Sequence, residues 1–243
     1  MFLMIIHGLQ KLTLLDYPGK VAATLFLGGC NFRCPFCQNS GLVLSPNEEA
    51  VIPTEEVLKF LKKRQGILDG ICITGGEPTL SPDLKPFIQE IHSMGYLVKL
   101  DTNGTNPQLL KELMEEGLLD YIAMDIKSSR KGYARCAGLA VFPEAAQQQL
   151  LAKTFQSAEL LMEGRIPFEF RTTVVKKLHD ASDFEDISLW LAGCPAYYLQ
   201  AYRDSDQVLC PETFHSYTRP ELEVFRQILK KTISVVEIRG LDT

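Results

Sequence analysis

The feature that most constrains the fold of this chain is a regular alternation of short apolar segments with longer segments of helical periodicity. The apolar segments, which we expect to be strands, are residues 21–27, 70–73, 97–100, 121–125, 167–175 and 196–201. Expected helices follow them at residues 53–65, 81–94, 107–116, 143–163, 181–192 and 219–231. Strands that are apolar on both faces and alternate with helices are typical of a parallel sheet covered by helices. A final edge strand is expected at residues 235–238.

Six such units predict an α/β fold and, more specifically, an open, partial (β/α)6 barrel. Right-handed connections curl a parallel sheet toward a barrel, and a closed barrel of eight units takes about 250 residues. The chain has 243 residues, without a low-complexity tract or a long linker. We therefore expect one domain over residues 1–243, with residues 1–20 as a short N-terminal extension. The open side would leave room for a large substrate, such as a loop of another protein.

Two helix starts can be predicted from capping residues. Thr54 is expected to cap the helix at residues 53–65, because threonine is a favourable N-cap residue. Ser81, followed by Pro82, is expected to cap the helix at residues 81–94, since proline suits the first helical position.

Composition and charge argue against several classes of protein. Hydrophobic residues make up 46% of the chain and charged residues 23%, which is typical of a globular protein with a large core. The net charge of −5 gives no general attraction to nucleic acid or to anionic membranes, and no apolar run approaches the length of a transmembrane helix. Seven cysteines, of which three are clustered, fit a reducing compartment better than a disulfide scaffold. We expect a cytoplasmic protein that binds neither nucleic acid nor membrane.

Three cysteines lie close together after the first expected strand, at Cys30, Cys34 and Cys37. Gly28 and Gly29 precede them and let the backbone turn sharply. Thiolates this close usually bind a metal. An iron–sulfur cube normally takes four cysteines, so a [4Fe–4S] cluster held by three would keep one iron open to a small molecule with an amino and a carboxylate group. The alternative is a structural zinc site with three cysteines and a histidine, although no histidine follows within the next fifty residues.

Polar residues gather where the other expected strands end. Ligands of parallel α/β folds bind at the C-terminal ends of the strands, so these residues and the cysteines should share one rim. They are, in chain order, Gly75, Gly76, Glu77, Asp101, Asn103, Asp125, Lys127, Arg171, Thr172, Thr173, Gln200 and Arg203.

Several of these residues also have an ordinary structural explanation. Gly75 and Gly76 could form a plain turn before a helix, and Asn103 could belong to an Asn-Gly turn. Asp125 and Lys127 lie on the same side of an extended segment, where they could bind a zwitterionic amino acid such as methionine. The alternative is a salt bridge between the two side chains.

The C-x3-C-x2-C spacing of Cys30, Cys34 and Cys37 resembles the signature of radical S-adenosylmethionine (SAM) enzymes. Residues Gly8–Gly19 resemble the start of anaerobic ribonucleoside-triphosphate reductase activating proteins, which are relatives of the pyruvate formate-lyase activating enzyme. The resemblance extends over nearly the whole chain. It implies a [4Fe–4S] cluster on the three cysteines and SAM as the second cofactor. It also implies reductive cleavage of SAM to a 5′-deoxyadenosyl radical, which takes a hydrogen atom from a glycine of a partner enzyme.

The resemblance further implies roles for individual residues. Gly75–Glu77 is similar to the motif that binds the methionyl amino group of SAM, and Asp125–Lys127 is similar to an Asp-Leu-Lys motif that contacts SAM. Phe36 could stack on adenine. Two residues depart from the family, since Gln38 and Arg203 stand where activating enzymes have histidine, and arginine cannot act as a neutral base. The full set of expected cofactor contacts is Phe36, Gln38, Gly75, Gly76, Glu77, Asp101, Asn103, Asp125, Lys127 and Arg203.

The implied protein partner is a glycyl radical enzyme, first of all an anaerobic ribonucleotide reductase, and the implied electron donor is a flavodoxin or a ferredoxin. An iron without a protein ligand is oxygen-labile, which favours anaerobic or micro-aerobic life. Two alternatives remain open at this point. One is a radical SAM enzyme that acts on a small molecule, such as a deazapurine synthase, and the other is a non-catalytic zinc or iron–sulfur module.

The remaining cysteines and histidines form no motif. Cys72 lies within an expected buried strand and should be a small core residue. The other three cysteines are far apart in sequence: Cys136, Cys194 and Cys210. The histidines are isolated and are expected to be ordinary surface or core residues: His7, His92, His179 and His215.

Overall fold

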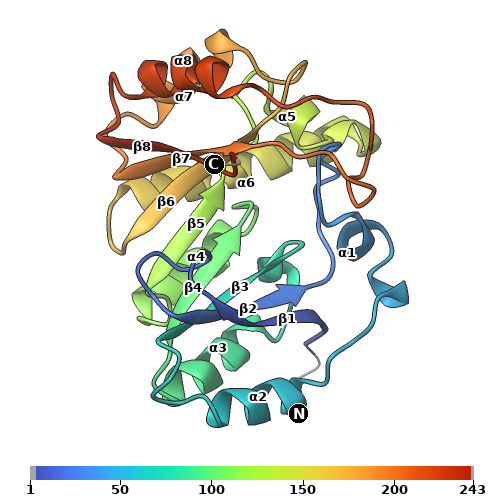
Figure 1. The fold of residues 1–243 in the computed structure, drawn as a ribbon, viewed down its shortest axis with the longest axis vertical. Coiled ribbons are helices and arrows are strands. Elements are labelled where there is room, and N and C mark those ends of the chain that lie inside the picture. The colour runs from blue at the N-terminus through green and yellow to red at the C-terminus, as the bar shows by residue number, and fades with distance from the viewer. Residues whose placement is uncertain (1–3, 242–243) are drawn as a thin grey trace.

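The computed structural model describes residues 4–241 and shows an α/β fold built around one eight-stranded sheet (Figure 1). The strands lie side by side in chain order, and only the first pair, β1 with β2, is antiparallel. This confirms the predicted α/β class with a mostly parallel, open sheet. The strands are β1 (Ile6–Thr13), β2 (Ala22–Leu27), β3 (Gly70–Gly75), β4 (Leu97–Thr102), β5 (Tyr121–Asp125), β6 (Phe168–Val174), β7 (Ala196–Ala201) and β8 (Val235–Arg239).

The longer helices lie outside the curved sheet, and the short helix α1 lies beyond the ends of its strands (Figure 1). They are α1 (Ser40–Leu44), α2 (Thr54–Lys62), α3 (Leu84–Ser93), α4 (Pro107–Glu115), α5 (Tyr133–Cys136), α6 (Glu144–Met162), α7 (Ala181–Trp190) and α8 (Arg219–Leu229). Three short 3-10 helices join them, namely η1 (Pro46–Glu48), η2 (Pro78–Leu80) and η3 (Leu139–Val141).

The sheet has two strands more than the six of the predicted (β/α)6 barrel. One of them, β8, is the expected edge strand and pairs in parallel with β7. The other, β1, was not predicted, because its burial does not alternate and Gln10, Lys11 and Leu12 are exposed. Among the described residues β1 and β8 are the two edges of the sheet, so the barrel stays open between them.

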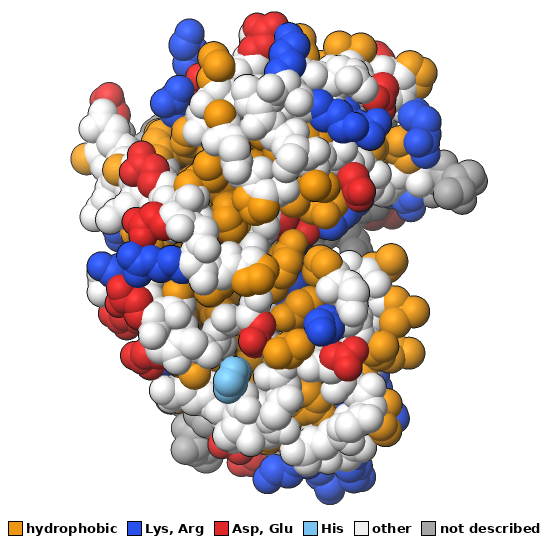
Figure 2. All heavy atoms as spheres, turned by 90° about the vertical axis from the view of Figure 1, so that its left-hand side faces the viewer, with side chains coloured by type: hydrophobic (Ala, Val, Ile, Leu, Met, Phe, Trp, Pro, Cys, Tyr) orange, Lys and Arg blue, Asp and Glu red, His pale blue; other side chains and the backbone are white. Residues whose placement is uncertain are grey.

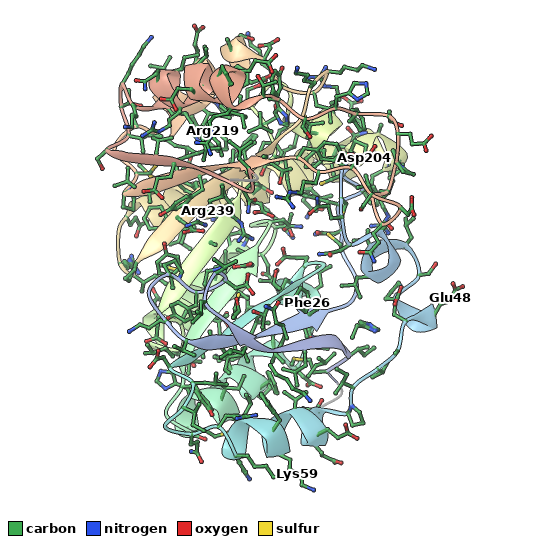
Figure 3. All side chains as sticks on the ribbon, viewed as in Figure 1. Phe26, Glu48, Lys59, Asp204, Arg219 and Arg239 are labelled. Carbon is green, nitrogen blue, oxygen red and sulfur yellow. The ribbon has the colours of Figure 1, made fainter. Side chains whose placement is uncertain are left out.

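Neighbouring rows of side chains on the sheet have opposite chemistry. Leu25 of β2 pairs with Ile73 of β3, which pairs with Leu100 of β4, and this apolar row belongs to the main core. The preceding row is Thr24, Cys72 and Lys99. Because side chains alternate along a strand, the second row faces the inside of the open barrel. The concave inner face is therefore polar, and the outer face under the helices is apolar. Figure 3 labels one residue from each side of the sheet, Phe26 of β2 and Arg239 of the edge strand β8.

Both predicted helix caps are wrong. Pro53 occupies the N-cap position of α2, and the Thr54 hydroxyl donates a hydrogen bond to the Met4 carbonyl oxygen at 3.2 Å instead. The helix α3 begins after Asp83, because Ser81 already ends the short helix η2. The short helices α1 and α5 were also not predicted, since four or five residues carry too little periodicity.

Within residues 4–241 no helix combines the length and the apolar character needed to cross a membrane. Residues 1–3 and 242–243, at the two ends of the predicted single domain, lie outside the described part of the chain.

Candidate functional site

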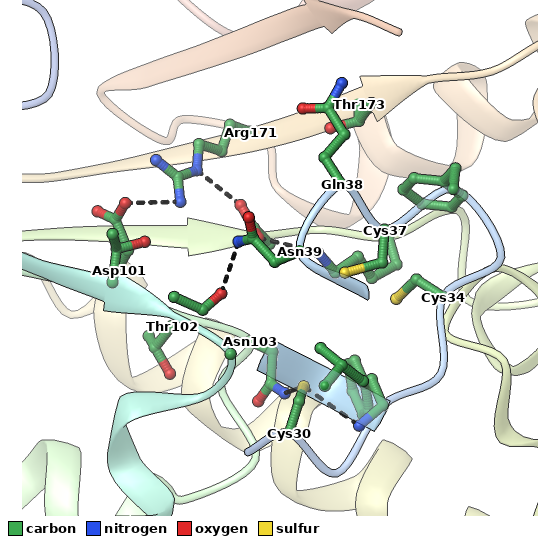
Figure 4. Close-up of a pocket in the computed structure, with 18 of the residues that line it drawn as sticks. Cys30, Cys34, Cys37, Gln38, Asn39, Asp101, Thr102, Asn103, Arg171 and Thr173 are labelled. Atoms are coloured by element: carbon green, nitrogen blue, oxygen red, sulfur yellow. Dashed lines mark hydrogen bonds and ion pairs between the residues drawn. The ribbon is translucent and has the colours of Figure 1, made fainter. Parts of the chain in front are cut away.

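A cavity of about 270 Å³ lies at the C-terminal ends of the parallel strands, beside the cysteine loop (Figure 4). Almost all of the predicted cluster ligands and cofactor contacts line it, as the strand-end argument requires; the exceptions are Glu77 and Arg203, and Thr172, which was expected at the rim, does not line it either. The lining residues that were predicted are Cys30, Cys34, Phe36, Cys37, Gln38, Gly75, Gly76, Asp101, Asn103, Asp125 and Lys127. Three further residues expected at the rim also line the cavity, namely Arg171, Thr173 and Gln200, and so do Asn39 and Thr102.

The cysteine loop is folded by its own backbone and by one arginine. The Cys37 amide donates to the Cys34 carbonyl oxygen at 3.0 Å. The Arg33 guanidinium donates from Nη1 to the carbonyl oxygens of Cys30 and Phe32, at 2.6 and 2.8 Å. These bonds hold three thiols around the cavity (Figure 4).

Burial raises the pKa of the Cys30 thiol to about 11 and also raises the pKa of the Cys34 thiol. Both thiols therefore keep their protons at neutral pH unless a cation replaces them. In the described residues, no group of three or more His, Cys, Asp or Glu side chains is arranged to hold a single metal ion.

The segment that follows β7, residues 203–210, holds the cysteine loop in place. After β7, the amides of Leu209 and Cys210 donate to the carbonyl oxygens of Cys37 and Pro35, both at 2.9 Å. The Gln38 side-chain amide donates to the Arg203 carbonyl oxygen at 3.0 Å. The Arg203 guanidinium instead donates to the Gly240 carbonyl oxygen at 3.1 and 3.2 Å. Contrary to expectation, the exposed Arg203 side chain does not face the cavity.

Gly75 and Gly76 allow the end of β3 to approach the backbone that leads into the cysteine loop. A Cβ atom at Gly75, which has a φ of +117°, would lie 2.3 Å from the Leu27 carbonyl oxygen. A Cβ atom at Gly76 would lie 2.0 Å from the Gly29 carbonyl oxygen. The Gly76 amide donates to the Leu27 carbonyl oxygen at 2.8 Å. The glycines are thus required for backbone packing, in addition to any contact with a ligand.

Glu77 points away from the cavity and organises the loop after β4. Its carboxylate accepts hydrogen bonds from the amides of Thr79 and Asn103, at 3.1 and 2.6 Å, and from the Thr102 hydroxyl at 2.8 Å. The side chain is buried, and burial raises its pKa although these hydrogen bonds oppose the shift. Glu77 therefore supports the wall of the cavity, contrary to the expectation that it contacts the ligand.

Asn103 does more than form a turn. Its side-chain amide donates to Asn31 Oδ1 at 2.9 Å and approaches Cys30 Sγ at 3.8 Å. Asn39, which was not predicted, donates to the Gly75 carbonyl oxygen at 2.9 Å (Figure 4). These two asparagines join the ends of β3 and β4 to the cysteine loop. Asn31, the partner of Asn103, and Asn39 could not be identified from a local sequence pattern, because their partners are distant in sequence.

A chain of alternating charges crosses the floor of the cavity. Arg171 lies between two carboxylates: its Nη2 is 3.0 Å from Asp101 Oδ2, and its Nε is 2.6 Å from Asp125 Oδ1. Asp125 Oδ2 is also 2.8 Å from Lys127 Nζ, so the salt bridge considered for this pair is present. Burial alone would raise the pKa values of Asp101 and Asp125, but the neighbouring cations outweigh it and lower both. Both carboxylates are therefore charged at neutral pH.

His179, which was expected to be an ordinary surface or core histidine, is buried and contacts both Lys127 and Phe36. Its Nδ1 accepts a hydrogen bond from the Val175 amide at 3.1 Å, so its Nε2 carries the proton and donates to the Lys127 carbonyl oxygen at 2.7 Å. Burial lowers its pKa, which keeps the ring neutral. Its ring lies edge-on to Phe36, with the centroids 6.2 Å apart. His179 thus connects the cysteine loop to Lys127.

Comparison with protein families and curated proteins gives consistent matches. The model of the radical SAM superfamily matches residues 24–188. A Methanocaldococcus jannaschii protein, named as a candidate glycyl-radical enzyme activating enzyme, is 32% identical over 98% of this chain and 97% of its own length. The 7-carboxy-7-deazaguanine synthase of Haemophilus influenzae is 27% identical over 68% of this chain and 78% of its own.

Solved structures share the fold at low sequence identity. A domain of the pyruvate-formate lyase-activating enzyme from Bacteroides vulgatus matches with a TM-score of 0.54 at 17% identity, covering 70% of this chain and 99% of that domain. SuiB of Streptococcus suis, solved with bound S-adenosylmethionine, matches with a TM-score of 0.64 at 14% identity, covering 87% of this chain and 48% of SuiB.

Proposed function

The chain belongs to the radical SAM superfamily, and from that premise we propose that it is an activating enzyme for a glycyl radical enzyme. One observation carries this proposal: the match to the activating-enzyme relative of M. jannaschii covers 98% of this chain and 97% of the relative. The similarity thus extends well beyond the cysteine loop and the region shared with the superfamily model.

The cysteine loop fits the iron–sulfur cluster that the superfamily implies. Three thiols of one loop border the cavity, and we assign Cys30, Cys34 and Cys37 as the cluster ligands. When bound, a reduced [4Fe–4S] cluster and SAM together supply a 5′-deoxyadenosyl radical, which removes a hydrogen atom from the substrate. The protein's part is to offer buried thiols, which would release their protons to solvent as the cluster binds, and to keep the loop folded through Arg33.

The charged floor of the cavity fits the methionyl end of SAM. Asp125, Lys127 and Arg171 present carboxylate and cationic groups to one space, which suits a zwitterionic amino acid. We assign the remaining predicted lining residues to contacts with SAM, with the buried Phe36 ring beside the adenine. Glu77 acts through Asn103, and Arg203 acts through Gln38, so neither needs to touch the cofactor.

A protein substrate fits the open side of the barrel. The sheet edges β1 and β8 are not paired with each other in the described part of the chain. Figure 2 views the opposite face, on which the β1–β2 loop lies at the N-terminal ends of the parallel strands, away from the cavity; apolar side chains gather across its middle. We propose a glycyl radical enzyme as the partner, with anaerobic ribonucleotide reductase first because of the resemblance of Gly8–Gly19. A flavodoxin or ferredoxin would serve as the electron donor.

The proposal is tested by electron paramagnetic resonance (EPR) of the protein with candidate partners. Anaerobically reconstituted protein, SAM and dithionite should cleave SAM slowly alone. Adding an anaerobic ribonucleotide reductase should give a glycyl doublet, and a partner with alanine at the radical glycine should give none. A pyruvate formate-lyase is the second partner to test. Absence of a radical on both partners would contradict the proposal.

A second candidate function is a radical SAM reaction on a small molecule. The similarity to the H. influenzae 7-carboxy-7-deazaguanine synthase over 78% of that enzyme supports it. In that case a small molecule, rather than a protein, should drive multiple turnovers of SAM under the same conditions.

A further inference from the structure

Lys99 is a buried lysine to which the proposed reaction gives no role. It lies on β4 with a side chain only 2% exposed and forms an ion pair with Asp101 Oδ1. Its Nζ is 3.7 Å from Cys72 Sγ. Lysine is almost never fully buried without a partner, because removing its charge from water is costly. Lys99 does not line the cavity, so it acts behind the residues that do.

Lys99 is the first member of the charge chain on the cavity floor. Asp101 holds Lys99 with one carboxylate oxygen and Arg171 with the other. Arg171 in turn forms an ion pair with Asp125, and Asp125 forms one with Lys127. The strand pairing fixes this order, because Asp125 of β5 lies directly opposite Arg171 of β6. A change at Lys99 is therefore transmitted through Asp101 to the groups that face the ligand.

Lys99 also determines the total charge of this chain of residues. Three cations and two carboxylates leave an excess of one positive charge. Without Lys99 the remaining four groups, all of which line the cavity, are balanced. A buried charge acts over a longer distance than a solvated one, because it is screened less. The excess charge therefore favours an anionic group in the cavity.

We propose that Lys99 is a positioning residue that makes the cavity selective for a ligand with a free carboxylate. It does so by fixing Asp101 and by supplying the excess positive charge of the floor. This inference rests on the proposed function, in which the carboxylate belongs to the methionyl end of SAM. Lys99 touches neither SAM nor the cluster in this arrangement.

The test compares two ligands that differ only in the carboxylate, SAM and decarboxylated SAM. Calorimetry on the cluster-loaded protein gives both dissociation constants and hence their ratio. Lys99→Met keeps the length of the side chain and removes its charge, and it should reduce the preference for SAM by about tenfold. The control Lys85→Met removes a half-buried lysine that pairs with Glu116 at the surface, and it should leave the ratio unchanged.

Two further variants separate charge from structure. Asp101→Asn alone raises the excess charge and should increase the preference for SAM. The double variant Lys99→Met with Asp101→Asn restores an excess of one positive charge and should return the ratio toward that of the wild type. If Lys99→Met does not fold, Asp101→Asn and the double variant still decide the question.

An unchanged ratio in Lys99→Met, or an equal loss of affinity for both ligands, would overturn the inference and leave Lys99 a structural residue. An unchanged ratio in Asp101→Asn would overturn it equally. If the variants give these results but the wild-type protein binds SAM and forms a glycyl radical on the partner, the inference about Lys99 fails and the proposed function stands. A wild-type protein that binds neither ligand rejects both.

Discussion

The inner and outer faces of the sheet use the same strands for different purposes. On the outer face, Leu25, Ile73 and Leu100 are fully buried under the helices, and each such side chain contributes about 1.5–3 kcal/mol through burial. On the inner face, Lys99 and Glu169 are buried as deeply but carry charge. Burying charge is costly unless it is paired, so the inner face adds little to stability. The comparison indicates that stability comes from the outer face and specificity from the inner one.

The inner face is divided along its length. Near the C-terminal ends of the strands, the charges of Asp101, Asp125 and Arg171 border the cavity. Further down, Glu169 accepts from the Tyr121 hydroxyl at 3.0 Å and from Arg239 Nη1 at 2.8 Å, away from the cavity. Only the group near the C-terminal ends of the strands therefore contacts a ligand in the cavity directly.

The largest effect is expected at the cysteine loop, where a cysteine at the cavity can be compared with a cysteine in the apolar core. Cys34→Ala should abolish iron binding, because a buried ligand is removed from a set of three. Cys194→Ala removes a buried thiol from the outer core and should lower stability while the iron content per folded molecule stays normal. Anaerobic reconstitution followed by iron and sulfide analysis measures both. Stoichiometric iron in Cys34→Ala would contradict the assignment of the cluster to this loop.

Gly76→Ala is expected to have the next largest effect. A methyl group there would lie 2.0 Å from the Gly29 carbonyl oxygen, so the cysteine loop must move and iron binding should fall sharply. Gly164→Ala, where nothing lies within 4 Å but φ is +70°, should cost only about 1 kcal/mol of stability and keep the iron. Iron content and urea unfolding of both variants give the measurement. Equal iron content in the two would contradict the packing role of Gly76.

Arg171→Gln should destabilise the protein through the inner face. It leaves Asp101 and Asp125 without their shared cation, which should cost about 3–5 kcal/mol of unfolding free energy at pH 7. The lowered pKa values of both carboxylates mean that this stability is present above their usual pKa and is lost as the pH falls. The variant should therefore lose less stability than the wild type as the pH falls from about 5 to about 2, around and below the usual Asp pKa of about 3.9. The unfolding free energies of both proteins are measured by urea unfolding at several pH values. If they fell in parallel with pH, Arg171 would not be the cause of the lowered carboxyl pKa values.

The smallest effect is expected at His179. Burial lowers its pKa, so the folded protein binds the proton less readily than the unfolded chain does. Its contribution to stability is complete above the usual histidine pKa of about 6.5 and falls as the pH drops toward the lowered value. In His179→Gln this part of the pH dependence should disappear, while the glutamine amide can still bond Lys127. Unfolding free energies from pH 8 to pH 5 measure it, and an unchanged slope would show that another group titrates.

The sequence predicted the parts of the fold and site that depend on local patterns. The strand at Tyr121–Asp125 was located with its observed bounds, because it is apolar on both faces. The three cysteines and the strand-end residues line one cavity because parallel strands end at the same rim. The edge strand β1 was missed because its exposed residues lack alternation.

The rest of the site depends on contacts between distant residues. A lysine at position 99 resembles any surface lysine until Asp101, Cys72 and the strand pairing are known. Glu77 follows two glycines at the rim, yet its carboxylate turns toward the loop after β4. His179 reaches Lys127 from 52 positions away. No local pattern in the sequence contains these partners.

The most direct test of the proposed reaction follows a hydrogen atom from the partner enzyme. The partner, first an anaerobic ribonucleotide reductase, is prepared with glycine deuterated at the α-carbon and incubated with the reconstituted protein, SAM and dithionite. If the partner's glycine is the hydrogen source, mass spectrometry should find one deuterium in each 5′-deoxyadenosine and one such molecule per glycyl radical. Deoxyadenosine without deuterium, formed while the partner gains no radical, would contradict the activating-enzyme function.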